Sequence, residues 1–80
     1  MDKKVFQAAC RLLWGPRYQV EASRQLKIAR SSIVQYDDGR RTPQPATVEL
    51  LHRLLTRHQA EVEKVLPRVA AAAQVVEEAA

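Results

Sequence analysis

Residues 19–43 of this 80-residue chain read QVEASRQLKIARSSIVQYDDGRRTP, and this stretch decides the fold. Apolar residues recur three or four positions apart over residues 17–26 and again over 30–38, which is the spacing of one helix face. The three residues 27–29 between them are too few for anything but a turn. Gly39 stands where a residue in the left-handed conformation often ends a helix. The stretch therefore predicts two short helices joined by a tight turn.

Another helix is predicted before this unit. Asp2 is placed to cap a helix that runs to about Leu13, and Gly15 and Pro16 follow as a stop signal. Cys10 falls next to the buried face, and we expect it to be a small core residue. The buried face itself is expected to comprise Val5, Phe6, Ala9, Leu12 and Leu13.

A longer helix is predicted after the loop at residues 39–45. Two prolines in this loop hold the residues before them out of the helical region. From Ala46 onward, apolar side chains keep a helical period as far as Pro67, which should kink or break the helix. Residues 68–80 then form an Ala-rich helical extension.

No segment alternates apolar and polar residues over four or more positions, so no strand is predicted. We expect an all-α fold: a small helical bundle with a central helix-turn-helix over residues 1–66, and a C-terminal helical extension over residues 67–80. The extension is either a dimer contact or a disordered tail. Hydrophobic residues make up 46% of the chain, but twelve of them are Ala, so the core is thin and a partner chain is plausible.

Positive charge is concentrated in the N-terminal half. The net charge is +4, and residues 1–41 carry nine Lys and Arg against four acids, while residues 42–80 carry four against five. A basic region attracts polyanions, of which nucleic acid is the commonest. A solubilising surface would explain the same charge, so charge alone leaves both interpretations open.

Composition argues against several classes of protein. One Cys and two His are too few for a disulfide framework or a four-ligand zinc site. Without a Gly-rich phosphate loop or convergent acid, base and nucleophile groups, we expect no enzyme, no cofactor and no small-molecule ligand. The absence of a long apolar stretch and of an export signal favours a soluble, cytoplasmic protein that does not contact a membrane.

The stretch 19–43 resembles the Cro and lambda-repressor type (XRE-type) of helix-turn-helix transcriptional regulator. With the flanking helices, the similarity covers about residues 3–66. Two positions depart from the family pattern: Lys27 stands where the turn usually has Gly, and Ala29 where Ser or Thr usually caps the recognition helix. The resemblance implies a lambda-repressor-like fold that binds double-stranded DNA. The matching positions are Gln19, Ser23, Ile28, Ile33, Tyr36 and residues 39–43.

Helical geometry selects the residues of the second short helix that would face DNA. At about 100° per residue from Ile33, the side chains of Ser31, Val34 and Gln35 point away from the core, and Arg30 extends from the first turn. Arg can pair with two atoms of guanine and Gln with two atoms of adenine, so we expect these four residues to read bases. The resemblance implies phosphate contacts by Gln19, Ser32, Arg40 and Arg41, with Arg17 and Lys27 as further candidates.

An apolar stripe in the long helix suggests a contact between two copies. Regulators of this type usually read two half-sites about 34–36 Å apart as dimers. We expect the interface to include Leu55, Val62, Val65, Leu66, Val69 and Val76, four of which repeat at seven-residue intervals. The alternative is that the stripe covers the domain's own core.

The sequence thus favours a homodimeric, sequence-specific DNA-binding regulator of prokaryotic or phage type. It would act as a repressor on an inverted-repeat operator at a promoter, with its own promoter among the candidate targets. Asp37 and Asp38 are expected to border the DNA-facing surface. The alternative from another class is a helical protein-interaction module, antitoxin-like or an adaptor, without DNA-binding activity.

Overall fold

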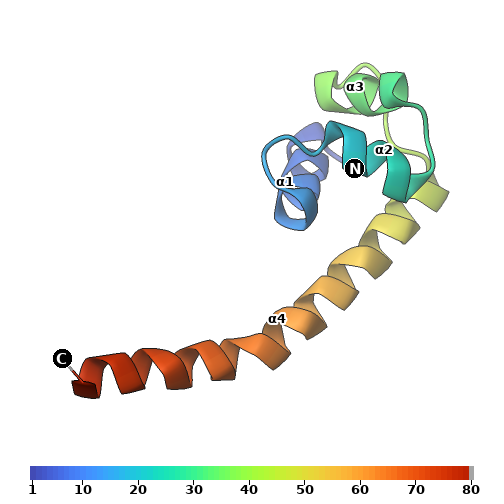
Figure 1. Cartoon of the computed structure of the whole chain (residues 1–80). Helices are drawn as coiled ribbons and strands as arrows, with labels where there is room; N and C mark the ends of the chain where they lie inside the picture. The colour runs from blue at the N-terminus through green and yellow to red at the C-terminus, as the bar shows by residue number, and fades with distance from the viewer. Residues whose placement is uncertain (80) are drawn as a thin grey trace.

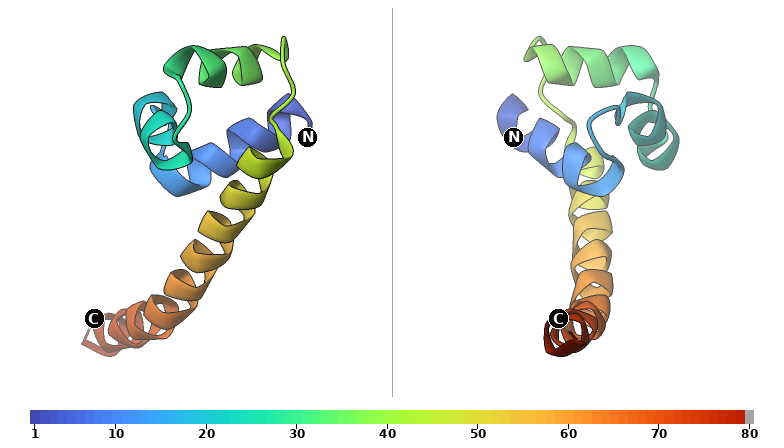
Figure 2. Two further views of the ribbon diagram at one scale, coloured as in Figure 1. Left: turned by 90° about the vertical axis from the view of Figure 1, so that its right-hand side faces the viewer. Right: turned by 60° about the vertical axis from the view of Figure 1, so that its left-hand side comes forward.

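The computed structural model describes residues 1–79, and the side chains of residues 1–74. Four α-helices follow one another along the chain (Figure 1): α1 (Lys3–Trp14), α2 (Gln19–Leu26), α3 (Arg30–Asp38) and α4 (Pro45–Ala79). No strand occurs in residues 1–79, so the all-α prediction is confirmed. The first three helices and the start of α4 form a small bundle, and the rest of α4 projects from it (Figure 2).

The core lies where α1, α2 and α3 meet the beginning of α4. Phe6 of α1 and Tyr36 of α3 pack edge to face, with ring centres 5.5 Å apart. Leu13, Trp14, Ile28 and three leucines of α4 are half-buried around it. Tyr18, Ala22 and Leu26 are buried, as are Ile33 and Tyr36, so the helical period of apolar residues in the two short helices is confirmed. The buried apolar core consists of Phe6, Ala9, Cys10, Tyr18, Ala22, Leu26, Ile33, Tyr36 and Leu51.

The predictions for α1 need two corrections. Val5 and Leu12 were expected in the core but are 54% and 68% exposed. The buried face of α1 centres on Phe6, and the other two residues lie about 100–120° around the helix from it. Asp2 does occupy the N-cap position, but its side chain makes no capping hydrogen bond.

A tight turn joins α2 to α3. Lys27 adopts the left-handed conformation (φ 56°, ψ 43°), which Gly would adopt without steric cost. The Ser23 hydroxyl donates a hydrogen bond to the carbonyl of Ile28 at 2.7 Å, and the Ile28 amide donates back to the Ser23 carbonyl at 3.2 Å. Ala29 is the N-cap of α3 and offers no side-chain acceptor. These bonds fix where α3 starts relative to α2.

Gly39 ends α3 as predicted. Its φ of 77° and ψ of 8° are left-handed, and the amides of Gly39 and Arg40 return to the carbonyls of Tyr36 and Gln35. A Cβ atom at Gly39 would lie 3.1 Å from Cδ of Lys3. The reversal brings the following two arginines alongside the end of α3.

The helix α4 is continuous through Pro67, so of the two predicted outcomes, a kink or a break, the break does not occur. Proline removes one backbone hydrogen bond and crowds the carbonyl four residues before it, which bends a helix away from the proline. Figure 1 shows α4 changing direction along its length, with the concave side toward α1. The residues on both sides of Pro67 stay helical, so the proline bends the helix without ending it.

The projection of α4 makes the molecule elongated. Its principal extents are 53 × 21 × 20 Å, and its radius of gyration is 16.4 Å. A compact domain of this length would have a radius of gyration of about 12 Å. In the part of the chain that the structure describes, neither α4 nor any other helix offers an apolar stretch sufficient to cross a bilayer.

Candidate nucleic-acid interface

The outward side of α3 carries the four residues predicted to read bases. Arg30 and Ser31 are exposed, whereas Val34 and Gln35 are half-buried. Because Ile33 of the same helix is fully buried, the helical phase turns these side chains away from the core. The polar atoms available on this surface are therefore a guanidinium, a hydroxyl and an amide.

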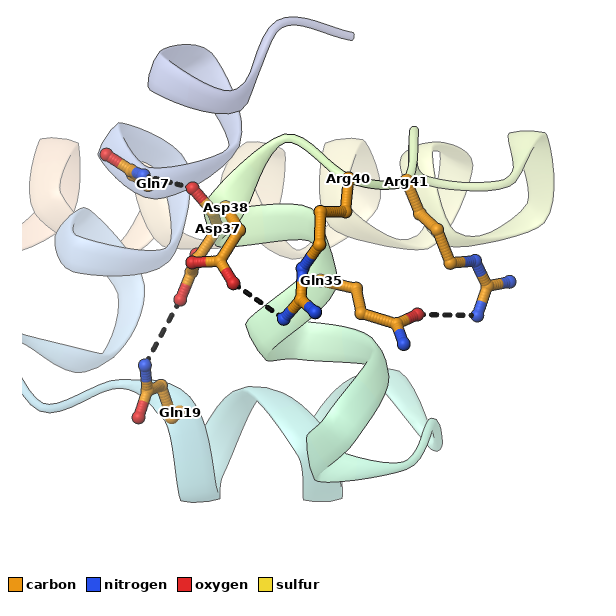
Figure 3. A network of polar contacts seen from close by, with 7 residues as sticks. All are labelled: Gln7, Gln19, Gln35, Asp37, Asp38, Arg40 and Arg41. Carbon is orange, nitrogen blue, oxygen red and sulfur yellow. Dashed lines mark hydrogen bonds and ion pairs between the residues drawn. The ribbon is translucent and has the colours of Figure 1, made fainter.

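Gln35 and Arg41 are held together at the C-terminal part of this surface (Figure 3). Nη1 of Arg41 donates a hydrogen bond to Oε1 of Gln35 at 3.1 Å. The Arg41 guanidinium also lies over the Tyr36 ring, 5.8 Å from its centre, in a cation–π contact. Both side chains are thus oriented, and the amide NH₂ of Gln35 is the group that remains to donate outward.

Arg40 forms an ion pair with Asp38 at 2.7 Å (Figure 3). Both side chains are largely exposed, and such pairs contribute about 0–1 kcal/mol. A phosphate that approached Arg40 would compete with Asp38 for the guanidinium. The pair therefore lowers the net charge that Arg40 adds to the surface.

Asp37 links α3 to α1 and to the start of α2, a role that no pattern in the sequence indicates. Its Oδ1 accepts a hydrogen bond from the Tyr18 hydroxyl at 2.6 Å, and its Oδ2 accepts one from Nε2 of Gln19 at 3.2 Å. Its backbone carbonyl accepts a bond from Nε2 of Gln7 on α1 at 2.9 Å (Figure 3). Asp37 thus anchors α3 to α1 and to the start of α2, and Gln19, predicted to contact phosphate, serves this network.

A hollow between the starts of α2 and α3 brings two exposed arginines together. Its lining includes Arg17, Gln19 and Arg30, which come from both helices and from the loop before α2. The first turn of a helix carries a partial positive charge from its backbone dipoles. An anionic group in this hollow would meet two guanidinium side chains and the N-terminal turn of α2.

The charges around α3 leave a surplus of cations. In the described part of the chain, the acidic side chains that face outward here are paired: Glu21 with Arg24 at 3.2 Å, and Asp38 with Arg40. Four further basic side chains are exposed and form no ion pair within residues 1–74: Arg17, Lys27, Arg30 and Arg41. Ser32, the remaining predicted phosphate contact, is half-buried. The surface around α3 is therefore positively charged.

Two buried groups behind this surface have shifted pKa values. Burial, assisted by the negative charge of Asp37, raises the pKa of the Cys10 thiol to about 12. Burial, followed by the hydrogen bond to Asp37, raises the pKa of Tyr18 above its usual range. Both groups are therefore uncharged near neutral pH. The described residues contain no cluster of His, Cys, Asp and Glu that could hold a metal ion.

The apolar stripe of α4 divides into two parts. Leu55 is half-buried against the chain's own core, together with Leu50 and Leu54. The predicted interface residues beyond it, Val62, Val65, Leu66 and Val69, are exposed. The side chain of Val76 lies outside the described residues.

No protein-family model, curated protein or solved structure matches this chain.

Proposed function

We propose that this protein is a sequence-specific, DNA-binding transcriptional regulator in which α2, the turn and α3 form a helix-turn-helix of the lambda-repressor type. The surplus of exposed cations around the outward side of α3 carries this proposal. An electropositive surface supplies affinity for the phosphate backbone, and polar groups on one exposed helix supply contacts to base edges. The helix α3 would be the recognition helix.

The structure supports some of the proposed contacts better than others. Arg30 is exposed in the first turn of α3 and is the main candidate for pairing with guanine. Gln35 is oriented by Arg41 and would donate its amide to a base, with Ser31 and Val34 as supplementary contacts. Among the proposed phosphate contacts, Arg17, Lys27 and Arg41 are exposed and without an ion pair in residues 1–74. Gln19 and Arg40 would have to leave their present partners.

The protein would act as a homodimer on an inverted repeat. A single recognition helix contacts few base pairs, and two copies related by a two-fold axis read two half-sites. A dimer bound at a promoter would block access of the polymerase, which makes repression the proposed outcome.

Selection of bound fragments from a random DNA pool tests the proposal. The wild-type chain should return a preferred half-site, and its affinity should fall steeply with salt. Arg30→Ala should lose preference at one or two base pairs and bind the selected site about 5- to 150-fold more weakly. Arg17→Ala, which removes a proposed phosphate contact that orients no base-reading side chain, should weaken binding across sequences and reduce the salt slope by about one.

Arg57→Ala is the matched control. Arg57 is an exposed arginine on α4, which packs on α1 and α2. Its removal changes the net charge as much as Arg30→Ala does, but base preference should not change. If Arg30→Ala kept the preference of the wild-type chain, α3 would not be the recognition helix.

The exposed apolar stripe of α4 favours a second candidate, a helical protein-interaction module without DNA-binding activity. An interaction module should show no salt-dependent affinity for any fragment of the random pool. The same DNA measurement therefore separates the two functions.

A further inference from the structure

The apolar face of α4 continues far beyond the core that it covers. Leu51 is buried and Leu55 half-buried, and the same helix face goes on to Val62 and Val69 at seven-residue steps. The apolar side chains of this second part are between 46% and 62% exposed. Small proteins rarely leave such a continuous apolar row in water unless it is an interaction site.

The exposed part of this face carries a shallow, open depression. The hollow is lined by His58, Glu61, Val62, Val65, Leu66 and Val69, all from α4. Pro67 lies about 140° around the helix from Val62, so the bend that it causes makes the apolar side concave. Figure 1 shows that the backbone of α4 is concave on the side of α1. A concave helix face can wrap around a second helix that crosses it, as helices do in a coiled coil.

The charged residues beside the apolar stripe can pair with the same residues of a second copy. Glu61 and Arg68 lie seven residues apart on the same edge of the apolar stripe. Neither forms an ion pair within residues 1–74. A two-fold axis between them would place the Glu61 of each copy beside the Arg68 of the other. In a parallel pair, Glu61 would instead lie beside the apolar Leu66 of the second copy.

We propose that the concave face of α4 binds the same face of a second copy in antiparallel orientation. In this register Val62 lies opposite Val65 of the second copy, His58 lies opposite Val69, and two Glu61–Arg68 ion pairs flank the contact. The two helices cross at this contact and separate beyond it, because the chain's own bundle covers the face around Leu51 and Leu55. The inference rests on the homodimer in the proposed function and specifies how it forms; it does not depend on the DNA contacts of α3. The face is its own complement, which is why a second copy is its partner.

Cysteine cross-linking of the full chain tests the orientation. His58→Cys and Val69→Cys are prepared with tags of different size, mixed and oxidised. A disulfide requires Cα atoms within about 7 Å. The antiparallel pair brings position 58 of one copy next to position 69 of the other, but leaves the two positions 58 about 16 Å apart along the axis. The mixture should therefore form a disulfide between the two variants, and neither variant alone should cross-link.

The wild-type chain is the control, because Cys10 is fully buried and its thiol has a raised pKa. It should not cross-link under the same conditions. Cross-links within each variant alone would indicate a parallel pair and overturn the proposal. Sedimentation of the wild-type chain as a monomer would also overturn the proposal. So would a wild-type dimer if the mixture of the two variants formed no disulfide between them.

Charge reversal gives a second test that does not alter the apolar contact. Glu61→Arg replaces two attractive pairs by repulsive ones and should raise the dimer dissociation constant about tenfold. Adding Arg68→Glu to this variant should restore it. Glu63→Arg makes the same charge change on the outer side of α4 and should leave the constant unchanged. Equal effects of Glu61→Arg and Glu63→Arg would contradict the proposed register.

Failure of this inference differs from failure of the proposed function. A monomer that still selects a DNA half-site would refute the pairing and leave DNA binding in place. An antiparallel dimer that selects no DNA would refute the proposed DNA binding and support the pairing of the two copies.

Discussion

The hydrogen bond from Tyr18 to Asp37 should make a measurable contribution to stability. Tyr18 is 5% exposed, and its hydroxyl donates to a carboxylate oxygen of Asp37 at 2.6 Å. Tyr18→Phe keeps the packed ring and removes only the hydroxyl. The substitution therefore isolates one bond of the network that holds α3 against α2.

The expected loss of stability in Tyr18→Phe follows from the surroundings of the Tyr18 hydroxyl and of Asp37. Hydrogen bonds to charged groups contribute about 1.5–3 kcal/mol. Asp37 is half-buried and keeps its bond from Gln19, so water can replace part of the lost interaction. We expect a loss near the lower end, about 1.5 kcal/mol, which corresponds to a fall of about 6–12 °C in Tm for a domain of this size.

Urea unfolding measures this loss, and Tyr36→Phe is the matched control. Tyr36 is as deeply buried, but its hydroxyl makes no hydrogen bond to another side chain or the backbone in the described residues. Its removal should change the free energy of unfolding by less than about 0.5 kcal/mol. If Tyr18→Phe cost no more than Tyr36→Phe, the network would not anchor α3. A double-mutant cycle with Asp37→Asn should return a coupling energy of about 1 kcal/mol or more.

Three further predictions concern the turn and the core. Ala29→Ser supplies the missing N-cap acceptor of α3 and should stabilise the fold by about 1 kcal/mol in urea unfolding. No gain would mean that the amide groups in the first turn of α3 already have other hydrogen-bond acceptors. Lys27→Gly removes the steric strain of the left-handed backbone but raises the conformational entropy of the unfolded chain, so the free energy of unfolding should rise by about 0.5–1 kcal/mol. The same substitution removes a proposed phosphate contact and should lower the salt slope of DNA binding by about one. The raised pKa of Cys10 gives stability that is complete below pH 9 and lost as pH rises toward 12. The stability advantage of the wild-type chain over Cys10→Ala, measured by unfolding at pH 8 and pH 10.5, should therefore shrink with pH, and a constant difference would contradict the assignment.

The short helices could be predicted because local signals agree with one another. Residues 30–38 have a helical period, a Gly directly after them and a turn directly before them, and the observed α3 has these bounds. The sequence also showed that Lys27 replaces the glycine that is usual in this turn. In the structure Lys27 adopts the left-handed conformation that glycine would adopt there. Here backbone bonds within a few residues determine the structure.

The Asp37 network could not be predicted in the same way. Its donors come from residues 30, 19 and 18 positions away along the chain, and their meeting depends on how three helices pack. Periodicity gives the side of a helix that a residue occupies, but not the polar group that faces it. The prediction that Val5 and Leu12 are buried was wrong for a related reason. Helical spacing alone does not tell how much of the surface of α1 the other helices cover.

The apolar stripe of α4 shows how the size of the core decides between two interpretations of one pattern. The sequence favoured either a core-covering helix or a dimer contact, as though the whole stripe had one role. The bundle formed by α1, α2 and α3 reaches only as far along α4 as Leu55 and His58, where burial ends. Val69 lies about 16 Å further along the helix axis, beyond any side chain that the bundle can offer. A thin core therefore covers one part of the stripe and leaves the other exposed. This exposed part, next to the bend at Pro67, is where the proposed second copy would bind.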